Sequence, residues 1–157
     1  MEYDLSVTIG RPPEAVWSVL TEIQDYIHAP GSPVPEMEKI PSGPTKVGTR
    51  WREVVRLAPG VTMTMWSQVI AIEPNHRLEE SFRGPWMSGV LRYTIAPRDG
   101  GSVLRQRETV TPHGPLRLVA PLMDRMLGPR LVVRLQDIRT LLERGAPVEA
   151  TTTAASA

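Results

Sequence analysis

The chain has 157 residues, 41% of them hydrophobic and 22% charged, which suits one globular domain with a hydrophobic core. The net charge of +1 gives no electrostatic reason to expect nucleic acid or an anionic membrane as the main partner. The absence of cysteine excludes disulfides, a thiol nucleophile and thiolate metal sites. No apolar run approaches the roughly 20 residues of a membrane span, and the first ten residues lack a signal-peptide pattern, so we expect a cytoplasmic protein.

The first third of the chain predicts a strand, a short helical region and a long loop. Residues 3–9 alternate between apolar and polar side chains, which indicates a half-buried strand. A Pro-Pro-Glu start and an amphipathic pattern predict a helix over 13–23, with a second turn or helix through Tyr26 and Ile27. The stretch from 28 to 48 holds five prolines and three glycines, which predicts a loop with one short strand inside it.

The middle of the chain has the pattern of a strand meander. The expected strands, including the short one in the loop, cover residues 37–40, 50–56, 61–72, 77–82, 90–95 and 103–111. Because short turns join most of them, neighbouring strands should be antiparallel. Counting the first strand, a sheet of about seven strands is expected, and a sheet of this size twists and curls.

The last long apolar segment, from about 116 to 142, predicts a helix. One stripe at helical spacing consists of Leu127, Leu131, Leu135, Ile138 and Leu142. Pro121 and the Gly128-Pro129 pair interrupt the pattern, so we expect one kinked helix or two abutting ones. The part after the pair should pack against the sheet. The part before it, with Met123 and Met126, should form the wall or lid of a cavity.

This order of elements predicts an α+β fold in which a curved antiparallel sheet wraps around a long C-terminal helix, with two short helices after the first strand. A cavity is expected between the sheet and the long helix. The domain should cover residues 1–145, and the last segment, 146–157, should be a disordered tail because it has no apolar period.

Five segments of the sequence carry a family resemblance. They are SVTIGRPPEAVWSVLTEI near the start, VGTRW at 47–51, VIAIEPNHRL at 69–78, YTIAP with GGSVL within 93–104, and a final helix ending TLLERG. Over about residues 1–145 the chain resembles the SRPBCC superfamily, also called START-like or helix-grip proteins, and most closely its polyketide cyclase/dehydratase and lipid-transport branch. The resemblance implies a helix-grip fold. It does not decide function, because members bind sterols, phospholipids, hormones or polyketides, catalyse aldol cyclisation and dehydration, or act as co-chaperone domains.

The sequence predicts no metal and no cofactor. Its three histidines, His28, His76 and His113, are far apart, and none has a metal-ligand partner three or four residues away. There is no glycine-rich phosphate-binding motif.

Polar residues on the concave side of the sheet are the candidates for chemistry. Strand alternation places Glu53, Glu80, Gln106 and Glu108 on the same side as apolar residues. A carboxyl group in an apolar cavity has a raised pKa and can act as a general acid or base, so Glu53 and Glu108, expected to face each other across the curl, are candidate catalytic residues. The alternative is that they pair with arginines at the cavity mouth, or that a bulge turns them outward.

His113 is a third candidate catalytic residue. It lies in the loop between the last strand and the helix, where it could donate a hydrogen bond to a ligand carbonyl. The alternative is an exposed loop histidine without a role.

Aromatic and methionine side chains suit a flat or flexible apolar ligand. The candidate ligand-binding residues are Trp51, Met63, Met65, Glu80, Trp86, Tyr93, Gln106, Met123 and Met126. Core packing is the alternative for each of the apolar residues in this set. Trp66 is out of phase with Met63 and Met65, so its direction is left open.

Six arginines fall on the opposite, convex side of the sheet. They are Arg50, Arg52, Arg56, Arg92, Arg105 and Arg107. They could dock an acidic partner such as a carrier protein, and a solvated outer face is the alternative.

Three functions are compatible with these patterns. The first is a carrier or sensor that binds a hydrophobic small molecule, lipid-like or polyketide-like, in an almost wholly apolar cavity. The second is a polyketide cyclase/dehydratase-like enzyme, which needs two or more converging polar groups in the cavity. The third is an interaction module with a collapsed core, which would leave a cavity too small for any ligand.

Overall fold

The computed structural model describes residues 1–25, 34, 36–58 and 60–144. One seven-stranded antiparallel sheet has the strand order β1-β7-β6-β5-β4-β3-β2. The strands are β1 (Glu2–Ile9), β2 (Glu36–Ile40), β3 (Arg50–Ala58), β4 (Val61–Glu73), β5 (Arg77–Arg83), β6 (Met87–Arg98) and β7 (Gly101–Pro112). The helices are α1 (Pro13–Thr21), the 3₁₀ turns η1 (Ile23–Asp25) and η2 (Gly114–Arg117), and α2 (Ala120–Arg144).

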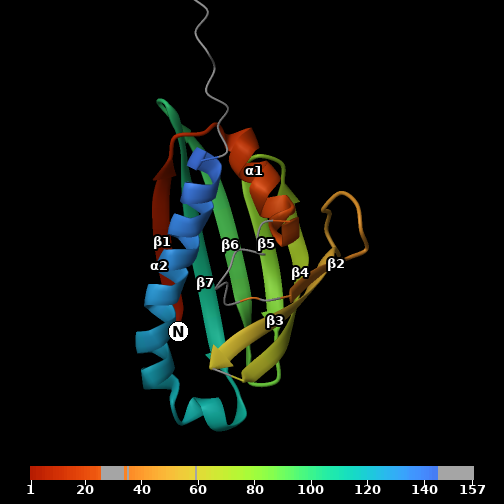
Figure 1. Ribbon diagram of the computed structural model, residues 1–157, viewed down its shortest axis with the longest axis vertical. Helices are drawn as coiled ribbons and strands as arrows, with labels where there is room; N and C mark the ends of the chain where they lie inside the picture. The colour runs from red at the N-terminus through yellow and green to blue at the C-terminus, as the bar shows by residue number, and fades with distance from the viewer. Residues whose placement is uncertain (26–33, 35, 59, 145–157) are drawn as a thin grey trace, which may run out of the picture.

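The sheet curls around α2, which lies along its concave side next to β1 and β7 (Figure 1). Helix α1 covers the same side further along the sheet (Figure 1). The predicted α+β helix-grip fold is therefore confirmed. The region predicted at Tyr26 and Ile27 and the predicted tail lie outside the described residues, and no described helix is long and apolar enough to cross a membrane.

Strand alternation builds the core because every second side chain of each strand points toward the helices. Ile9, Leu78, Ile95 and Leu104 are almost fully buried on this side. The facing residues of α2 are Leu131, Leu135, Ile138 and Leu142, all buried. Burying each such side chain stabilises the fold by about 1.5–3 kcal/mol, which holds α2 against the sheet.

Helix α2 is one continuous helix with Pro129 inside it, so the alternative of two abutting helices is wrong. Pro121 lies in the first turn, where a missing backbone N–H breaks no helical hydrogen bond. The expectation that the part before Pro129 forms the wall or lid of the cavity, while the part after it only packs on the sheet, is also wrong. Leu122 and Met126, in the first half, are 59% and 52% exposed, because they lie on the side of the helix that faces away from the sheet.

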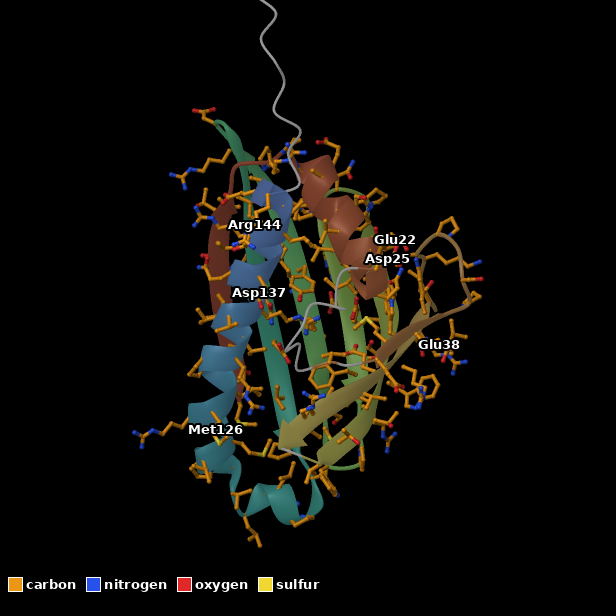
Figure 2. The ribbon with its side chains drawn as sticks, in the orientation of Figure 1. Glu22, Asp25, Glu38, Met126, Asp137 and Arg144 are labelled. Carbon is orange, nitrogen blue, oxygen red and sulfur yellow. The ribbon has the colours of Figure 1, made fainter. Side chains whose placement is uncertain are left out.

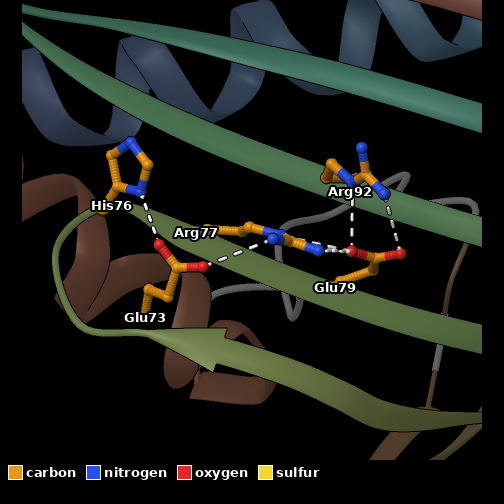
Figure 3. A network of polar contacts seen from close by, with 5 residues as sticks. All are labelled: Glu73, His76, Arg77, Glu79 and Arg92. Carbon is orange, nitrogen blue, oxygen red and sulfur yellow. Dashed lines mark hydrogen bonds and ion pairs between the residues drawn. The ribbon is translucent and has the colours of Figure 1, made fainter.

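The convex side of the sheet carries an ion-pair network centred on Glu79 (Figure 3). Arg77 and Arg92 both donate hydrogen bonds to this buried carboxylate. Arg77 also contacts Glu73, which accepts a bond from His76 across the β4–β5 turn. Hydrogen bonds from Arg92 and Arg77 hold the pKa of Glu79 below its ordinary value.

Other convex arginines have partners as well. Arg105 and Arg107 of β7 bind Asp4 of β1, and the hydrogen bond from Arg105 is the main reason why the pKa of Asp4 falls to about 2. Trp66 faces this side too, and the guanidinium of Arg50 lies 5.7 Å from the centre of its ring, a cation–π distance. The direction of Trp66 is thus outward.

Replacing Leu135 with alanine should lower the free energy of unfolding by about 2–5 kcal/mol, because it leaves a cavity under α2. Leu135 is only 2% exposed. The matched control is Leu122→Ala on the outward side, which should change stability by about 0.5 kcal/mol or less. Urea denaturation measures both variants. Equal losses would mean that something covers the outward side of α2 or that the helix is rotated.

Candidate functional site

A cavity lies between the concave side of the sheet, α1 and α2. Its lining residues are Leu20, Ile23, Met37, Trp51, Glu53, Glu80, Tyr93 and Arg134. They come from the end of α1, from η1, from β2, β3, β5 and β6, and from the middle of α2. The volume is about 10 Å³, which is room for about one water molecule. Half of the lining residues are apolar, called the apolar wall, and half carry polar groups, called the polar wall. The two sets meet where Met37 of β2 pairs with Glu53 of β3.

The apolar wall is fixed where α1 meets β2 and β3. Lys39 of β2 donates hydrogen bonds to the carbonyl of Thr21 and to the carboxylate of Glu22, at 3.2 and 2.7 Å. The indole N–H of Trp51 donates to the side-chain oxygen of Gln24 at 3.1 Å, so its ring is held edge-on to this corner. These bonds hold the apolar side chains of η1, β2 and β3 against the cavity.

Glu80 is the most perturbed carboxyl group of the polar wall. Burial raises its pKa from 4.5 to about 7, and the charges of Glu53 and Glu108 add to the effect, while Arg134 opposes it. Glu80 forms no hydrogen bond with another described residue. Glu80 is half-buried and lines the cavity. A carboxyl group in this position exchanges a proton near neutral pH.

Two further carboxylates stand beside Glu80. Glu53 accepts a hydrogen bond from the buried hydroxyl of Ser67 at 3.1 Å. Glu108 accepts one from the amide of Gln106 at 2.8 Å, and burial raises the pKa of Glu108, with Glu53 adding to the rise. This effect of Glu53 on the pKa of Glu108 places the two residues within electrostatic range across the curl, one on β3 and the other on β7.

Arg134 enters the cavity from α2. It is the charge that opposes the rise in pKa of both Glu80 and Glu108. Yet its guanidinium forms no ion pair and no hydrogen bond within the part of the chain that the structure describes. Arg134 is half-buried, and a charge that is partly removed from water without a direct partner is unfavourable.

Three buried polar atoms lack partners among the described residues, and two of them lie on the neighbouring strands β6 and β7, while the third is the Nε of Arg11. The hydroxyl of Tyr93, a residue 3% exposed, has none, and neither does the side-chain oxygen of Gln106, which is fully buried. The two residues are direct neighbours across β6 and β7. Burial raises the pKa of Tyr93 to about 12, so its hydroxyl stays protonated and can donate. Each unmade hydrogen bond costs about 1–3 kcal/mol.

A family model described as polyketide cyclase/dehydrase and lipid transport matches residues 2–143, nearly the whole described chain. The chain belongs to this family. No curated protein matches the sequence. Membership of the polyketide cyclase/dehydrase and lipid transport family suggests hydrophobic ligand binding, and it does not identify a ligand.

Solved structures share the fold of this family member at low sequence identity. A protein from Rhizobium leguminosarum is 15% identical with a TM-score of 0.74, over 92% of this chain and 95% of that one. A protein from Thermus thermophilus is 16% identical with a TM-score of 0.71, over 94% and 100%. A Mesorhizobium loti protein is 20% identical with a TM-score of 0.64, over 94% and 100%. At these identities the likeness shows the fold alone.

The residues predicted to act in this family member fall into two groups. Trp51, Glu53, Glu80 and Tyr93 line the cavity, and Glu108 and Gln106 adjoin them on β7. Outside the lining are Met63, Met65, Trp86, Met123, Met126 and His113. Met63 is buried and Met65 is half-buried in β4.

Three of the residues outside the cavity lining are exposed. Trp86 precedes β6 at the edge of the molecule and is exposed, as is Met126. His113 is also exposed, and its Nε2 lies 2.7 Å from the hydroxyl of Ser88. The loop that carries His113 therefore does not bring the imidazole to the cavity.

The sequence interpretation missed Arg134. Its position was available, because Arg134 lies three residues after Leu131 and four before Ile138, at the border of the buried stripe. A charged residue at the border of a buried helix face either reaches solvent or enters a site. The described residues contain no group of three or more metal-ligand side chains placed to hold a metal ion.

Glu80→Gln and Glu79→Gln should change stability in opposite directions, although the residues are adjacent in β5. Because the folded-state pKa of Glu80 is raised, wild-type stability should fall as pH rises from about 4.5 to 7, by about 3 kcal/mol. At about pH 8 the Glu80→Gln protein should be more stable than wild type, and at about pH 4 the two should be similar.

Glu79 supplies the control for this experiment. Its pKa is lowered by Arg92 and Arg77, so its contribution is present at neutral pH and is lost as pH falls. Glu79→Gln should therefore be less stable than wild type at neutral pH. Urea denaturation across this pH range measures both variants, and a Glu80→Gln protein that is destabilised at about pH 8 would contradict the assignment of a raised pKa.

Proposed function

We propose that the protein binds a hydrophobic small molecule in this cavity and holds it by an oxygen-bearing group placed between Arg134 and the glutamates. The observation that carries the proposal is the lack of hydrogen-bond partners for polar groups that line the cavity. Arg134 offers N–H donors and Glu80 offers an acceptor or a donor, depending on its proton, but neither is bonded to a described residue. A hydroxyl or carbonyl group would supply the missing partner on both sides.

The unpartnered Tyr93 hydroxyl supports the same proposal. It borders the same cavity and can donate to an oxygen placed there. The apolar wall, with Leu20, Met37 and Trp51, suits the apolar body of such a molecule. A polar end and an apolar end would then select the orientation of the ligand.

The small volume of the cavity bears on the alternative of a collapsed interaction module. A cavity with room for only one water molecule is consistent with a collapsed core. A collapsed core would not account for the three half-buried carboxyl groups and the half-buried arginine gathered at this space, because partly desolvated groups that form no ion pair within the described residues are unfavourable. A ligand larger than water requires the lining side chains to move apart, and the polar groups supply the binding energy that opposes this cost.

Native mass spectrometry of the protein purified from its own organism tests the proposal directly. The wild type should retain a small molecule. The Tyr93→Phe variant should retain about tenfold less, because a hydrogen bond to a charged or strongly polar group contributes about 1.5–3 kcal/mol. Its stability should not fall, since the hydroxyl has no partner within the described chain in the ligand-free protein.

Tyr3→Phe is the matched control for that measurement. The hydroxyl of Tyr3 donates to Asp124 at 2.6 Å outside the cavity, so its loss should lower stability and leave ligand retention unchanged. A wild-type protein that retains no molecule, or two variants that retain equal amounts, would contradict the proposal.

A second candidate function is proton-transfer catalysis, and the raised pKa of Glu80 favours it. A general base works best when its pKa lies near the working pH, and that of Glu80 is about 7. Ionised Glu80 would remove a proton from the carbon next to a ligand carbonyl. The electron pair of the C–H bond would form the carbon–carbon double bond of an enolate, the π pair of the carbonyl would move to its oxygen, and Arg134 would stabilise the resulting negative charge. This step begins an aldol cyclisation, and Glu53 and Glu108 would tune Glu80 rather than react.

Deuterium exchange tests the enzyme hypothesis separately from binding. If Glu80 removes such a proton, the retained molecule should gain deuterium at that carbon when it is incubated with the protein in D₂O. Glu80→Gln should slow the exchange by about 10²–10⁴-fold, and Glu79→Gln, on the convex side, should leave its rate unchanged. A retained carbonyl compound that gains no deuterium with wild type would contradict catalysis and leave the binding proposal standing.

A further inference from the structure

The outward side of α2 carries a second apolar stripe, opposite the residues that pack on the sheet. This outer apolar stripe consists of Leu118, Leu122, Met126 and Val133, which are 88%, 59%, 52% and 58% exposed. Spacings of four, four and seven residues place them on one side of a helix. The helical path already includes the residues just before α2, since the N–H of Met123 donates to the carbonyl of Val119.

The outer apolar stripe runs from the residues just before α2 to Val133, near the middle of the helix. Figure 2 labels Met126, Asp137 and Arg144, which are 11 and 7 residues apart and so fall close to one side of α2 after whole turns. The apolar side chain at the first position gives way to charged ones at the other two. Gln136 and Thr140, also exposed, continue the polar outer side. A contiguous exposed apolar patch on one half of a helix marks an interaction surface.

Arginines border the outer apolar stripe. Arg125 and Arg130 are exposed and fall on either side of it by helical position, and Arg117 lies in η2 just before it. Residues 116–133 contain one acidic residue, Asp124, and its carboxylate accepts the hydrogen bond from Tyr3. The net charge of +1 for the whole chain therefore hides a local excess of positive charge.

Acidic side chains gather elsewhere. Figure 2 labels Glu22, Asp25 and Glu38 on the far side of the molecule from the first half of α2, near α1, η1 and β2. Glu22 is paired with Lys39, so the charge that distinguishes the two sides is the excess of arginine along the outer apolar stripe. An anionic plane would attract this side, which would orient the protein.

We propose that the outer apolar stripe inserts into the interface of an anionic lipid membrane, with Arg117, Arg125 and Arg130 at the level of the lipid phosphates. A second copy of the chain fits less well, because pairing the stripe with itself would bring the arginines together. Nucleic acid would use the arginines and leave the apolar side chains without a partner. A membrane surface with acidic lipids satisfies both. The proposal does not depend on what the cavity binds.

Co-sedimentation with vesicles tests the proposal on the full chain. The protein should bind vesicles of phosphatidylcholine mixed with phosphatidylserine, and it should bind pure phosphatidylcholine vesicles more weakly. Salt should weaken the binding to the mixed vesicles, because it screens the arginines. Arg125→Gln combined with Arg130→Gln should reduce the difference between the two vesicle types.

Paired aspartate variants isolate the apolar part. Leu122→Asp with Met126→Asp should lower the binding to mixed vesicles by about tenfold or more, because two inserted side chains are lost. The control is Gln136→Asp with Thr140→Asp, which adds the same charge at the same spacing to the polar half of the same side and should retain clearly more binding. All four positions are on the exposed side, so thermal unfolding should show folded proteins.

Three results would overturn the proposal. Wild type could fail to bind the mixed vesicles that contain phosphatidylserine. Alternatively, the two paired aspartate variants could bind these vesicles equally. Sedimentation velocity could also show a wild-type dimer that Leu122→Asp with Met126→Asp abolishes and the control keeps. That last result would assign the outer apolar stripe to a second copy of the chain.

Discussion

The contact between the inner side of α2 and the concave side of the sheet decides the chemistry of the interior. Leu131, Leu135, Ile138 and Leu142 are buried in this contact. Arg134 lies one residue before Leu135, so the same packing carries its guanidinium toward the sheet. Lifting the helix would free the charge and expose four leucine-sized side chains. The apolar contact thus imposes the position of the polar group, and the energy of packing offsets the cost of keeping that group inside.

One sheet creates two opposite environments for carboxylates. On the convex side, arginines on neighbouring strands donate directly to Glu79 and to Asp4, and solvent is near. On the concave side, Glu80 has protein around it and a cation that it does not touch. The same side-chain type therefore favours its ionised form on one side and its protonated form on the other. The difference follows from strand alternation alone, since the two glutamates are adjacent in β5.

Strand alternation also explains which parts could be predicted from the sequence. Period-two patterns place Glu53, Glu80, Tyr93 and Gln106 on the concave side, and the structure agrees because the bulges in β3 and β4 do not change their side. Turn residues and strand spacing predict the antiparallel order. The direction of the first half of α2 could not be predicted, because that segment has apolar residues on two sides and periodicity does not say which one faces the sheet. The position of Arg134 at the border of the buried stripe could be predicted, but whether its side chain reaches solvent or enters a site could not. The volume of a cavity depends on side-chain packing that no local pattern contains.

The ion pairs around Glu79 have a consequence for the opposite side of the sheet. Strand β5 carries two consecutive glutamates, and a slip of one residue in its pairing would exchange them between the sides. Arg77 lies two residues before Glu79 in the same strand, but Arg92 lies on β6, directly across from it. A slip of one residue would place Glu80 across from Arg92, so the ion pair alone does not distinguish the two alignments. The slip would also carry Leu78, which is 1% exposed, to the convex side, so the burial of Leu78 selects which glutamate the interior receives, and the bond between Arg92 and Glu79 stabilises that alignment.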